Sequence, residues 1–293
     1  MRARLCCDGR VSDYRPERLR EVAELLVGEA ADFVRRRRVE LLDPGVRGGA
    51  VRVTAVRAKS TPTDPVTLAD TETEQLVRDR LAVLRPGEHV LGEEGGGVAA
   101  DSDLRWVVDP IDGTVNFLYG IPAYAVSVAA QVNGVSVAGA VADVAGGRMY
   151  SAAAGLGAHV HCGGRSRRLA CNQISELSMA LLGTGFGYAR ARRAAQAALL
   201  ARMLPEVRDV RRMGSAALDL CLVAAGSLDV YYEHGLQVWD WAAGALIAAE
   251  AGAVVVLPES GGPGAEPLLA AAPGVSDQLI EALQRNSGWD PMP

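Results

Sequence analysis

Lysine is almost absent from this chain. Of its 30 Lys and Arg residues, only Lys59 is a lysine. Arginine carries a planar, forked cation, whereas lysine carries a compact ammonium group. Lys59 is therefore either a chance survivor in an arginine-rich composition or a position where a compact cation is needed.

Positive net charge and long apolar runs are also missing. The formal net charge is −5, so no general electrostatic attraction to nucleic acid or anionic membrane is expected. No stretch reaches the ~18 apolar residues of a membrane span, and the N-terminus lacks the apolar central region of a signal peptide. These absences predict a cytoplasmic protein without membrane contact.

Cysteine is too scarce and too scattered for a structural framework. The five cysteines are odd in number and contain no C-x-x-C pair, which excludes a disulfide scaffold and argues against a zinc site. Basic residues cluster at 35–38, 165–168 and 208–212. We interpret these clusters as solvated helix ends or loops, with contact to an anionic partner as the alternative.

The periodicity of apolar residues changes along the 293-residue chain. Helical spacing over 13–38 and 67–87 is followed by strands at 88–97 and 104–113, a hairpin over 123–143 that turns at Asn133-Gly134, and strands at 148–153 and 157–162. From 179 onward, strands alternate with helices at 190–204, 215–229, 238–252 and 276–287. We predict an α+β half over residues 1–160 and an α/β half over residues 161–293.

Acidic residues stand where predicted strands end or helices begin. They are Glu93, Glu94, Asp109, Asp112 and Asp240. Taken alone, each has an ordinary explanation as a turn, a solvated strand end or a helix cap. Taken together, carboxylates carried to the edge of a buried sheet can converge on one cleft, and such hard oxygen ligands suit Mg²⁺.

The next two residues, Gly113 and Thr114, supply a complementary feature. If Asp112 opens a short helix, the following backbone N–H groups point outward and can hold a phosphate. Thr114 then presents a hydroxyl beside the carboxylates. The pattern favours a phosphomonoester held between amides and metal ions.

These motifs resemble a known family. The stretches 92-GEE-94, 109-DPIDGTVNF-117 and 239-WDWAAG-244, supported by 59–70 and 214–235, resemble the signatures of the inositol monophosphatase family, Mg²⁺-dependent and lithium-sensitive sugar phosphatases. Details point to the bacterial SuhB-type branch, and the composition points to an actinobacterial, mycobacterial-like member. The resemblance implies a five-layer α-β-α-β-α sandwich and a homodimer.

The resemblance also implies that two to three Mg²⁺ ions bind per site, and it implies which residues are their ligands. Glu93, Asp109 and the carbonyl of Ile111 would hold the first ion. Asp109, Asp112 and Asp240 would hold the second, and Glu93 would face a weaker third site.

The reaction implied is attack by a metal-activated water on phosphorus. Glu93 and Thr114 would orient this water, and Asp70 would fix the Thr114 hydroxyl. Lys59 would offset the charge of the carboxylates.

The substrate implied is myo-inositol 1-phosphate or a related inositol monophosphate. Its phosphate would rest on the amides of Gly113 and Thr114. The inositol ring would contact the following residues: Asp112, Gly214, Ser215, Ala216 and Glu233. A carboxylate at Glu233 favours a polyol, because it would be left unpaired by a substrate without hydroxyls; a purely structural role is its alternative.

Two other functions fit the same motifs. Relatives on this fold act on fructose 1,6-bisphosphate, histidinol phosphate or adenosine 3′,5′-bisphosphate. The metal motifs contact only the phosphate, so they do not distinguish these substrates. SuhB-type proteins also resemble accessory factors of transcription antitermination. The acidic net charge argues against direct binding of nucleic acid, but not against a protein partner in a transcription complex.

Overall fold

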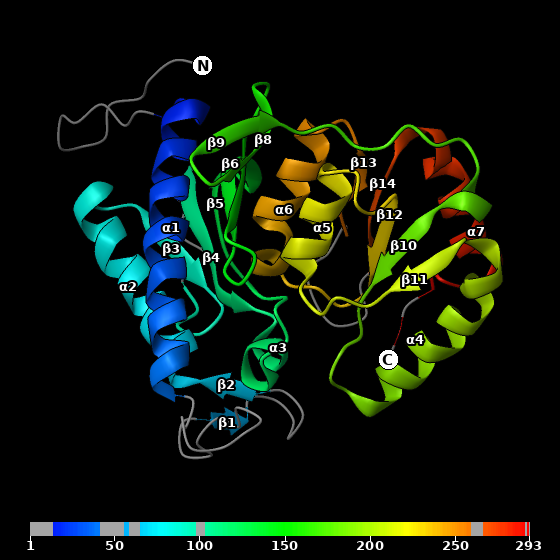
Figure 1. Ribbon diagram of the computed structural model, residues 1–293, viewed down its shortest axis with the longest axis horizontal. Helices are drawn as coiled ribbons and strands as arrows, with labels where there is room; N and C mark the ends of the chain where they lie inside the picture. The colour runs from blue at the N-terminus through cyan, green and yellow to red at the C-terminus, as the bar shows by residue number, and fades with distance from the viewer. Residues whose placement is uncertain are drawn as a thin grey trace.

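The structure is a computed structural model that describes residues 14–41, 56–58, 65–97, 103–258, 266–290 and 292. Its elements stack in five layers, helix, sheet, helix, sheet and helix, from left to right in Figure 1. The predicted five-layer α-β-α-β-α sandwich is therefore confirmed. Within these ranges, every helix is too short or too polar to cross a membrane.

The larger sheet orders its strands along the chain, from β3 to β9. Its members are β3 (His89–Gly92), β4 (Leu104–Asp112), β5 (Ala125–Val132), β6 (Val135–Asp143), β7 (Arg148–Ala153), β8 (Gly157–Cys162) and β9 (Arg165–Arg168). Strand β3 is parallel to β4, and the other neighbours are antiparallel. Asn133 and Gly134 turn between β5 and β6 with φ values of 52° and 80°, as a type I′ turn requires.

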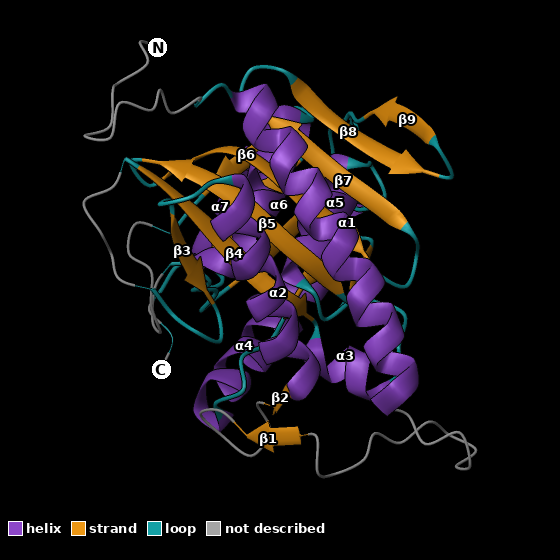
Figure 2. Cartoon of the chain, turned by 90° about the vertical axis from the view of Figure 1, so that its left-hand side faces the viewer, coloured by secondary structure: helices purple, strands orange, loops and turns teal. Residues whose placement is uncertain are grey.

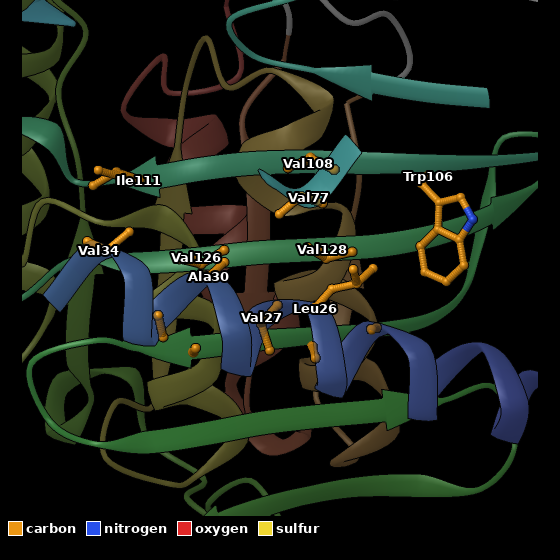
Figure 3. Close-up of a cluster of buried hydrophobic side chains, with 14 of the residues drawn as sticks. Leu26, Val27, Ala30, Val34, Val77, Trp106, Val108, Ile111, Val126 and Val128 are labelled. Atoms are coloured by element: carbon orange, nitrogen blue, oxygen red, sulfur yellow. The ribbon is translucent and has the colours of Figure 1, made fainter. Parts of the chain in front are cut away.

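Two long helices cover the outer face of this sheet (Figure 2). They are α1 (Pro16–Leu41) and α2 (Leu68–Leu84). The buried positions of α1 recur every three or four residues, as in Leu19, Ala23, Leu26, Ala30 and Val34. Figure 3 shows this stripe packed on the strands, where it meets apolar side chains such as those of Val126 and Val128.

The middle layer consists of α5 (Ala216–Ala224) and α6 (Val238–Glu250). Helix α6 packs mainly on the larger sheet and contacts the smaller one at β13, and α5 contacts strands of both sheets. Small residues permit this close packing. A Cβ on Gly139 of β6 would stand 3.0 Å from both Cα and Cβ of Ala243 in α6. The helices therefore lie close enough to both sheets to bring their N-termini to the junction.

The smaller sheet has the order β11-β10-β12-β14-β13. Its strands are β10 (Leu181–Thr184), β11 (Asp209–Arg211), β12 (Val230–Glu233), β13 (Val254–Val256) and β14 (Leu268–Ala271). The outermost layer is α4 (Arg190–Met203) and α7 (Ser276–Arg285). Shorter elements are α3 (Thr114–Tyr119), the pair β1 (Val56–Ala58) and β2 (Pro65–Thr67), and the 3₁₀ turns η2 (Leu177–Met179), η3 (Leu204–Glu206) and η4 (Pro273–Val275).

Three features differ from the sequence-based expectation. The basic cluster 165–168, expected in a loop or helix end, forms the edge strand β9, because charged residues exposed on both faces hide the alternation of a strand. The pair β1 and β2 was not predicted. The larger sheet also continues through Arg168, past the predicted boundary at residue 160, and the division into two halves stays a prediction.

Candidate functional site

The predicted site residues surround a cavity of about 580 Å³ at the junction of the two sheets. Those that line it are Glu93, Asp109, Ile111, Asp112, Gly113, Thr114, Gly214, Ser215, Ala216, Glu233 and Asp240. Asp70 does not line it but contacts Thr114 from behind. Lys59 lies outside the described residues. Segments far apart in the sequence thus meet at one place.

Glu93 is positioned by a buried carboxylate on α2. Its own N–H donates to the carbonyl of Val108 at 3.2 Å, which extends the pairing of β3 and β4. Glu74, 2% exposed, then accepts the next two N–H groups, from Glu94 at 2.7 Å and Gly95 at 2.9 Å. This loop is therefore held in shape by a side chain that the sequence analysis did not single out.

Strand β4 carries Asp109, Ile111 and Asp112 to the edge of the cavity. Asp109 is buried, whereas Asp112 is half-buried. Oδ2 of Asp112 accepts hydrogen bonds from Oγ of Ser215 and from N of Ala217, both at 2.7 Å. Burial raises the pKa of Asp112 to about 6, although these two hydrogen bonds oppose the shift. The first sheet is thereby tied to the N-terminus of α5.

The hydroxyl of Thr114 reaches Asp70, as the sequence predicts. Oγ1 of Thr114 lies 3.1 Å from Oδ1 of Asp70 and 3.0 Å from the carbonyl of Ile111. The other oxygen of Asp70 accepts from the N–H and the hydroxyl of Thr67, which caps α2. Burial, opposed by these bonds, raises the pKa of Asp70 to about 7. Asp70 is thus a fixed support behind the cavity wall.

Gly113 occupies a turn that admits no side chain. Its φ is 95°, and a Cβ there would stand 2.9 Å from the carbonyl oxygen of Ala123 and 3.0 Å from that of Gly214. Helix α3 begins one residue later, so Asp112 ends the strand rather than opening the helix. Nδ2 of Asn116 donates at 2.7 Å to the carbonyls of Ala123 and Met213, which joins the same three segments.

The remaining two carboxylates come from the second half. Asp240 is in the first turn of α6, where its Oδ2 accepts from N of Gln237 at 2.6 Å. Burial, followed by the charge of Glu93, raises the pKa of Asp240 well above its usual range. Glu233 ends β12 and accepts from the hydroxyl of Tyr231 at 2.7 Å. Burial raises the pKa of Glu233 to about 7.

The donors at this cavity fit magnesium by their chemistry. Carboxylates and a backbone carbonyl are hard oxygen ligands. Burial raises the pKa values of Asp112 and Asp240, and neighbouring carboxylates add to the rise at Asp240. Within the described ranges, no three His, Cys, Asp or Glu side chains are arranged as they stand to hold a metal ion. The fit therefore rests on the kind of donor and its surplus of negative charge.

Two arginines at the cavity were not predicted as site residues. Arg192 and Arg212 both line it, and the guanidinium carbon of Arg212 lies 6.0 Å from the centroid of the Phe186 ring. Arg212 is exposed, as expected for cluster 208–212, but it also faces the cavity. Its role could not be read locally, because the cavity that it faces is built by distant segments.

Asp219 is a further buried acid that the sequence analysis passed over. It lies in α5, is 1% exposed, and its Oδ1 has no hydrogen-bond donor in the described part of the chain. Burial, followed by the charges of Glu233 and Asp112, raises its pKa well above the usual range. An acid inside the apolar stretch 215–229 was the available signal.

The contacts of Glu74 predict an effect on the Glu93 loop. In Glu74→Ala, the N–H groups of Glu94 and Gly95 lose their acceptor, so we expect their amide hydrogens to exchange faster, while the exchange in α6 stays unchanged. Glu72→Ala is the matched control, because Glu72 pairs with Arg37 instead. Equal exchange of the loop in both variants would show that Glu74 does not hold it.

The raised pKa of Glu233 predicts a pH-dependent stability in the absence of divalent metal. Because its folded-state pKa of about 7 exceeds the ordinary 4.5, its contribution is full below pH 4.5 and is lost as the pH rises through 7. Glu233→Gln should therefore gain stability relative to wild type by about 1–3 kcal/mol between pH 5 and 8. Chemical unfolding in EDTA measures this difference.

The control for this measurement is Glu281→Gln, since the side chain of Glu281 is 70% exposed on α7. It should follow the wild-type pH profile. A profile of Glu233→Gln that also runs parallel to the wild type would contradict the assignment of a raised pKa to Glu233.

Comparison with known proteins identifies one family over nearly the whole chain. The model of the inositol monophosphatase family matches residues 17–287. Inositol-1-monophosphatase of Mycobacterium leprae is 66% identical, over 96% of this chain and 99% of that protein. The solved structure of Mycobacterium tuberculosis SuhB aligns with a TM-score of 0.81 and 58% identity, over 95% of this chain and 100% of that one.

A more distant relative carries a different name. The Nus factor SuhB of Pasteurella multocida is 38% identical, over 75% of this chain and 83% of that protein. The family match nevertheless spans nearly the whole chain, and the mycobacterial relatives share most of their residues with it. The chain therefore belongs to the inositol monophosphatase family, and it is an enzyme of the phosphatase class.

Proposed function

We propose that this enzyme hydrolyses myo-inositol 1-phosphate and related inositol monophosphates to inositol and phosphate, with Mg²⁺ as cofactor. The observation that carries the proposal is the position of Glu233, which lines the same cavity as the carboxylates of Asp109, Asp112 and Asp240. A group suited to a polyol thus lies beside a cluster suited to phosphate and metal. The names of the mycobacterial relatives support the same substrate.

The metal ligands in this proposal are Glu93, Asp109, Asp112, Asp240 and the carbonyl of Ile111. Their surplus negative charge supports binding of two to three divalent cations. When bound, Mg²⁺ supplies positive charge that offsets the charge of the phosphate and makes a water molecule more acidic.

The protein's own groups orient the reactants. Glu93 and Thr114 would accept hydrogen bonds from the attacking water, and the bond between Thr114 and Asp70 would keep the hydroxyl in place. The main-chain N–H groups of Gly113 and Thr114 would hold the phosphate. Lys59 would offset the charge of the carboxylates.

The inositol ring of the substrate would be bound by Glu233 and the residues near it. Oε2 of Glu233 is occupied by the Tyr231 hydroxyl, which leaves Oε1 to accept a hydroxyl of inositol. Asp112 and residues 214–216 line the cavity nearby and would complete the ring contacts. A substrate without a hydroxyl at this place would leave Oε1 of Glu233 without a donor, which costs about 1–3 kcal/mol.

A comparison of four substrates tests the proposal. Phosphate release with Mg²⁺ is measured from inositol 1-phosphate, fructose 1,6-bisphosphate, histidinol phosphate and adenosine 3′,5′-bisphosphate. We expect inositol 1-phosphate to be preferred, and Glu233→Ala to lose that preference by about 10-fold or more in kcat/KM. Preference for another ester would retain the phosphatase mechanism and overturn the proposed substrate.

Asp240→Asn separates catalysis from a second candidate function. The name of the Pasteurella relative favours a role in a transcription complex, which needs no catalytic carboxylates. We expect Asp240→Asn to abolish phosphate release while retaining the fold by circular dichroism. Asp277→Asn, an exposed acid in the first turn of α7, should keep full activity.

Unchanged turnover in Asp240→Asn would remove Asp240 from the metal site. Co-purification of RNA polymerase subunits with this variant would support the transcription role. The homodimer and the inhibition by lithium stay predictions from the resemblance, and the cytoplasmic location stays a prediction from the composition.

A further inference from the structure

A second, separate cavity lies at the outer edge of the larger sheet. It has a volume of about 370 Å³ and shares no lining residue with the candidate active site. We call it the β7–β9 pocket; its lining residues are Arg148, Tyr150, Val160, Cys162, Arg165, Arg167, Ala225 and Ser227. The proposed phosphatase reaction uses none of them.

The strand register explains why these side chains meet. In antiparallel strands, residues directly opposite each other point to the same face. Two cross-strand rows form the pocket: Arg148, Cys162 and Arg165 in one, and Tyr150, Val160 and Arg167 in the other. The turn after α5 closes the end of the rows with Ala225 and Ser227.

The pocket gathers positive charge, which the charge of Asp143 near Arg148 offsets in part. Three arginines line it, and no aspartate or glutamate does. In the described part of the chain, none of these three arginines forms an ion pair. The nearest acid in the strand register is Asp143, opposite Arg148, and its Oδ1 is used by the N–H of Gly146 in the turn. Three like charges at one concavity favour an anionic ligand.

Protection of an edge strand does not account for the arrangement. Charged side chains on an edge strand prevent pairing with other chains, and this suffices for Arg165 and Arg167 alone. Arg148, however, lies two strands further in, on β7, and joins them on the same face. The protective role therefore does not apply to the third arginine, whose guanidinium donates a hydrogen bond to the Tyr150 hydroxyl inside the pocket.

Capping of α5 does not account for it either. Cations are favourable near the C-terminus of a helix. The last carbonyls of α5 already accept backbone N–H groups: Cys221 from Ala225, Val223 from Gly226, and Leu222 from Ser227. The arginines are not needed to satisfy that end.

We propose that the β7–β9 pocket binds a small anion that carries two phosphoryl groups. Guanidinium groups bind phosphate oxygens in pairs of parallel hydrogen bonds, and three of them match the charge of a diphosphate. The hydroxyl of Tyr150, which is 2% exposed, accepts from Arg148 and orients it, and the hydroxyl of Ser227 adds an uncharged donor. The volume lies in the range of small-molecule sites, about 300–1,000 Å³.

Cys162 provides a direct reporter of occupancy. It is an exposed free thiol in the pocket, whereas Cys171 and Cys221 are buried. The experiment uses the full-length chain in EDTA, so that divalent metal does not recruit phosphate to the carboxylate cavity. The rate of Cys162 alkylation by iodoacetamide is followed by mass spectrometry of its peptide, with and without pyrophosphate, at matched ionic strength.

We expect pyrophosphate at ten times its Kd to slow alkylation about tenfold, because the rate follows the fraction of empty pocket. Arg165→Gln combined with Arg167→Gln should remove this protection, and so should Arg148→Gln alone. Arg168→Gln is the matched control: it removes the same charge from β9 but points to the opposite face, opposite His159, and should retain protection.

Two results would overturn the proposal. One is an alkylation rate of the wild-type protein that stays unchanged at every pyrophosphate concentration used. The other is equal protection in the control and in the folded Arg148→Gln variant, which would indicate a general salt effect. Neither result depends on phosphatase activity, so the proposed function stands or falls separately.

Discussion

The structure is organised around the cost of holding several carboxylates at one cavity away from water. Burial raises the pKa of Asp70, Asp112 and Asp240, and the charge of Glu93 adds to the rise at Asp70 and Asp240. Three of them are stabilised in the same way, by N–H groups at the start of a helix. Asp70 binds the N-cap of α2, Asp240 that of α6, and Asp112 the first turn of α5. Asp70 and Asp240 lie in the first turns of their own helices, whereas Asp112 reaches the N-terminus of α5 from another segment.

This constraint also explains why the site lies between the two sheets. Asp112 ends a strand of the larger sheet, yet its hydrogen-bond donors belong to α5, which contacts the smaller sheet. Asn116 adds a second link, to Met213. Since Asp112 links the larger sheet to α5, the geometry of the cavity depends on how the middle helices pack against the sheets. Small residues on α5 and α6 set how closely these layers approach each other.

Much of the fold and most of the site follow from the sequence, for physical reasons. Periodic burial revealed α1, and the Asn133-Gly134 turn fixed the hairpin. The acids at strand ends were visible locally, and the resemblance supplied their roles. Edge strand β9 was missed because solvent reaches both of its faces, so no alternation remains. Arg212 and Glu74 were missed because their partners lie far away in the chain, and an acid on a helix face looks like any solvated residue.

The turn at Gly113 has an evolutionary consequence. Its left-handed φ and the carbonyl oxygens of Ala123 and Gly214 around it exclude every side chain, so this turn, where we propose that the phosphate binds, accepts no substitution. At the wall formed by Phe186 and Arg192 the close neighbours are side chains instead: a Cβ on Gly187 would stand 2.9 Å from Cδ of Arg192. If the proposed function holds, descendants of this scaffold can change the alcohol that they recognise by replacing side chains on that wall, while the turn at Gly113 stays as it is.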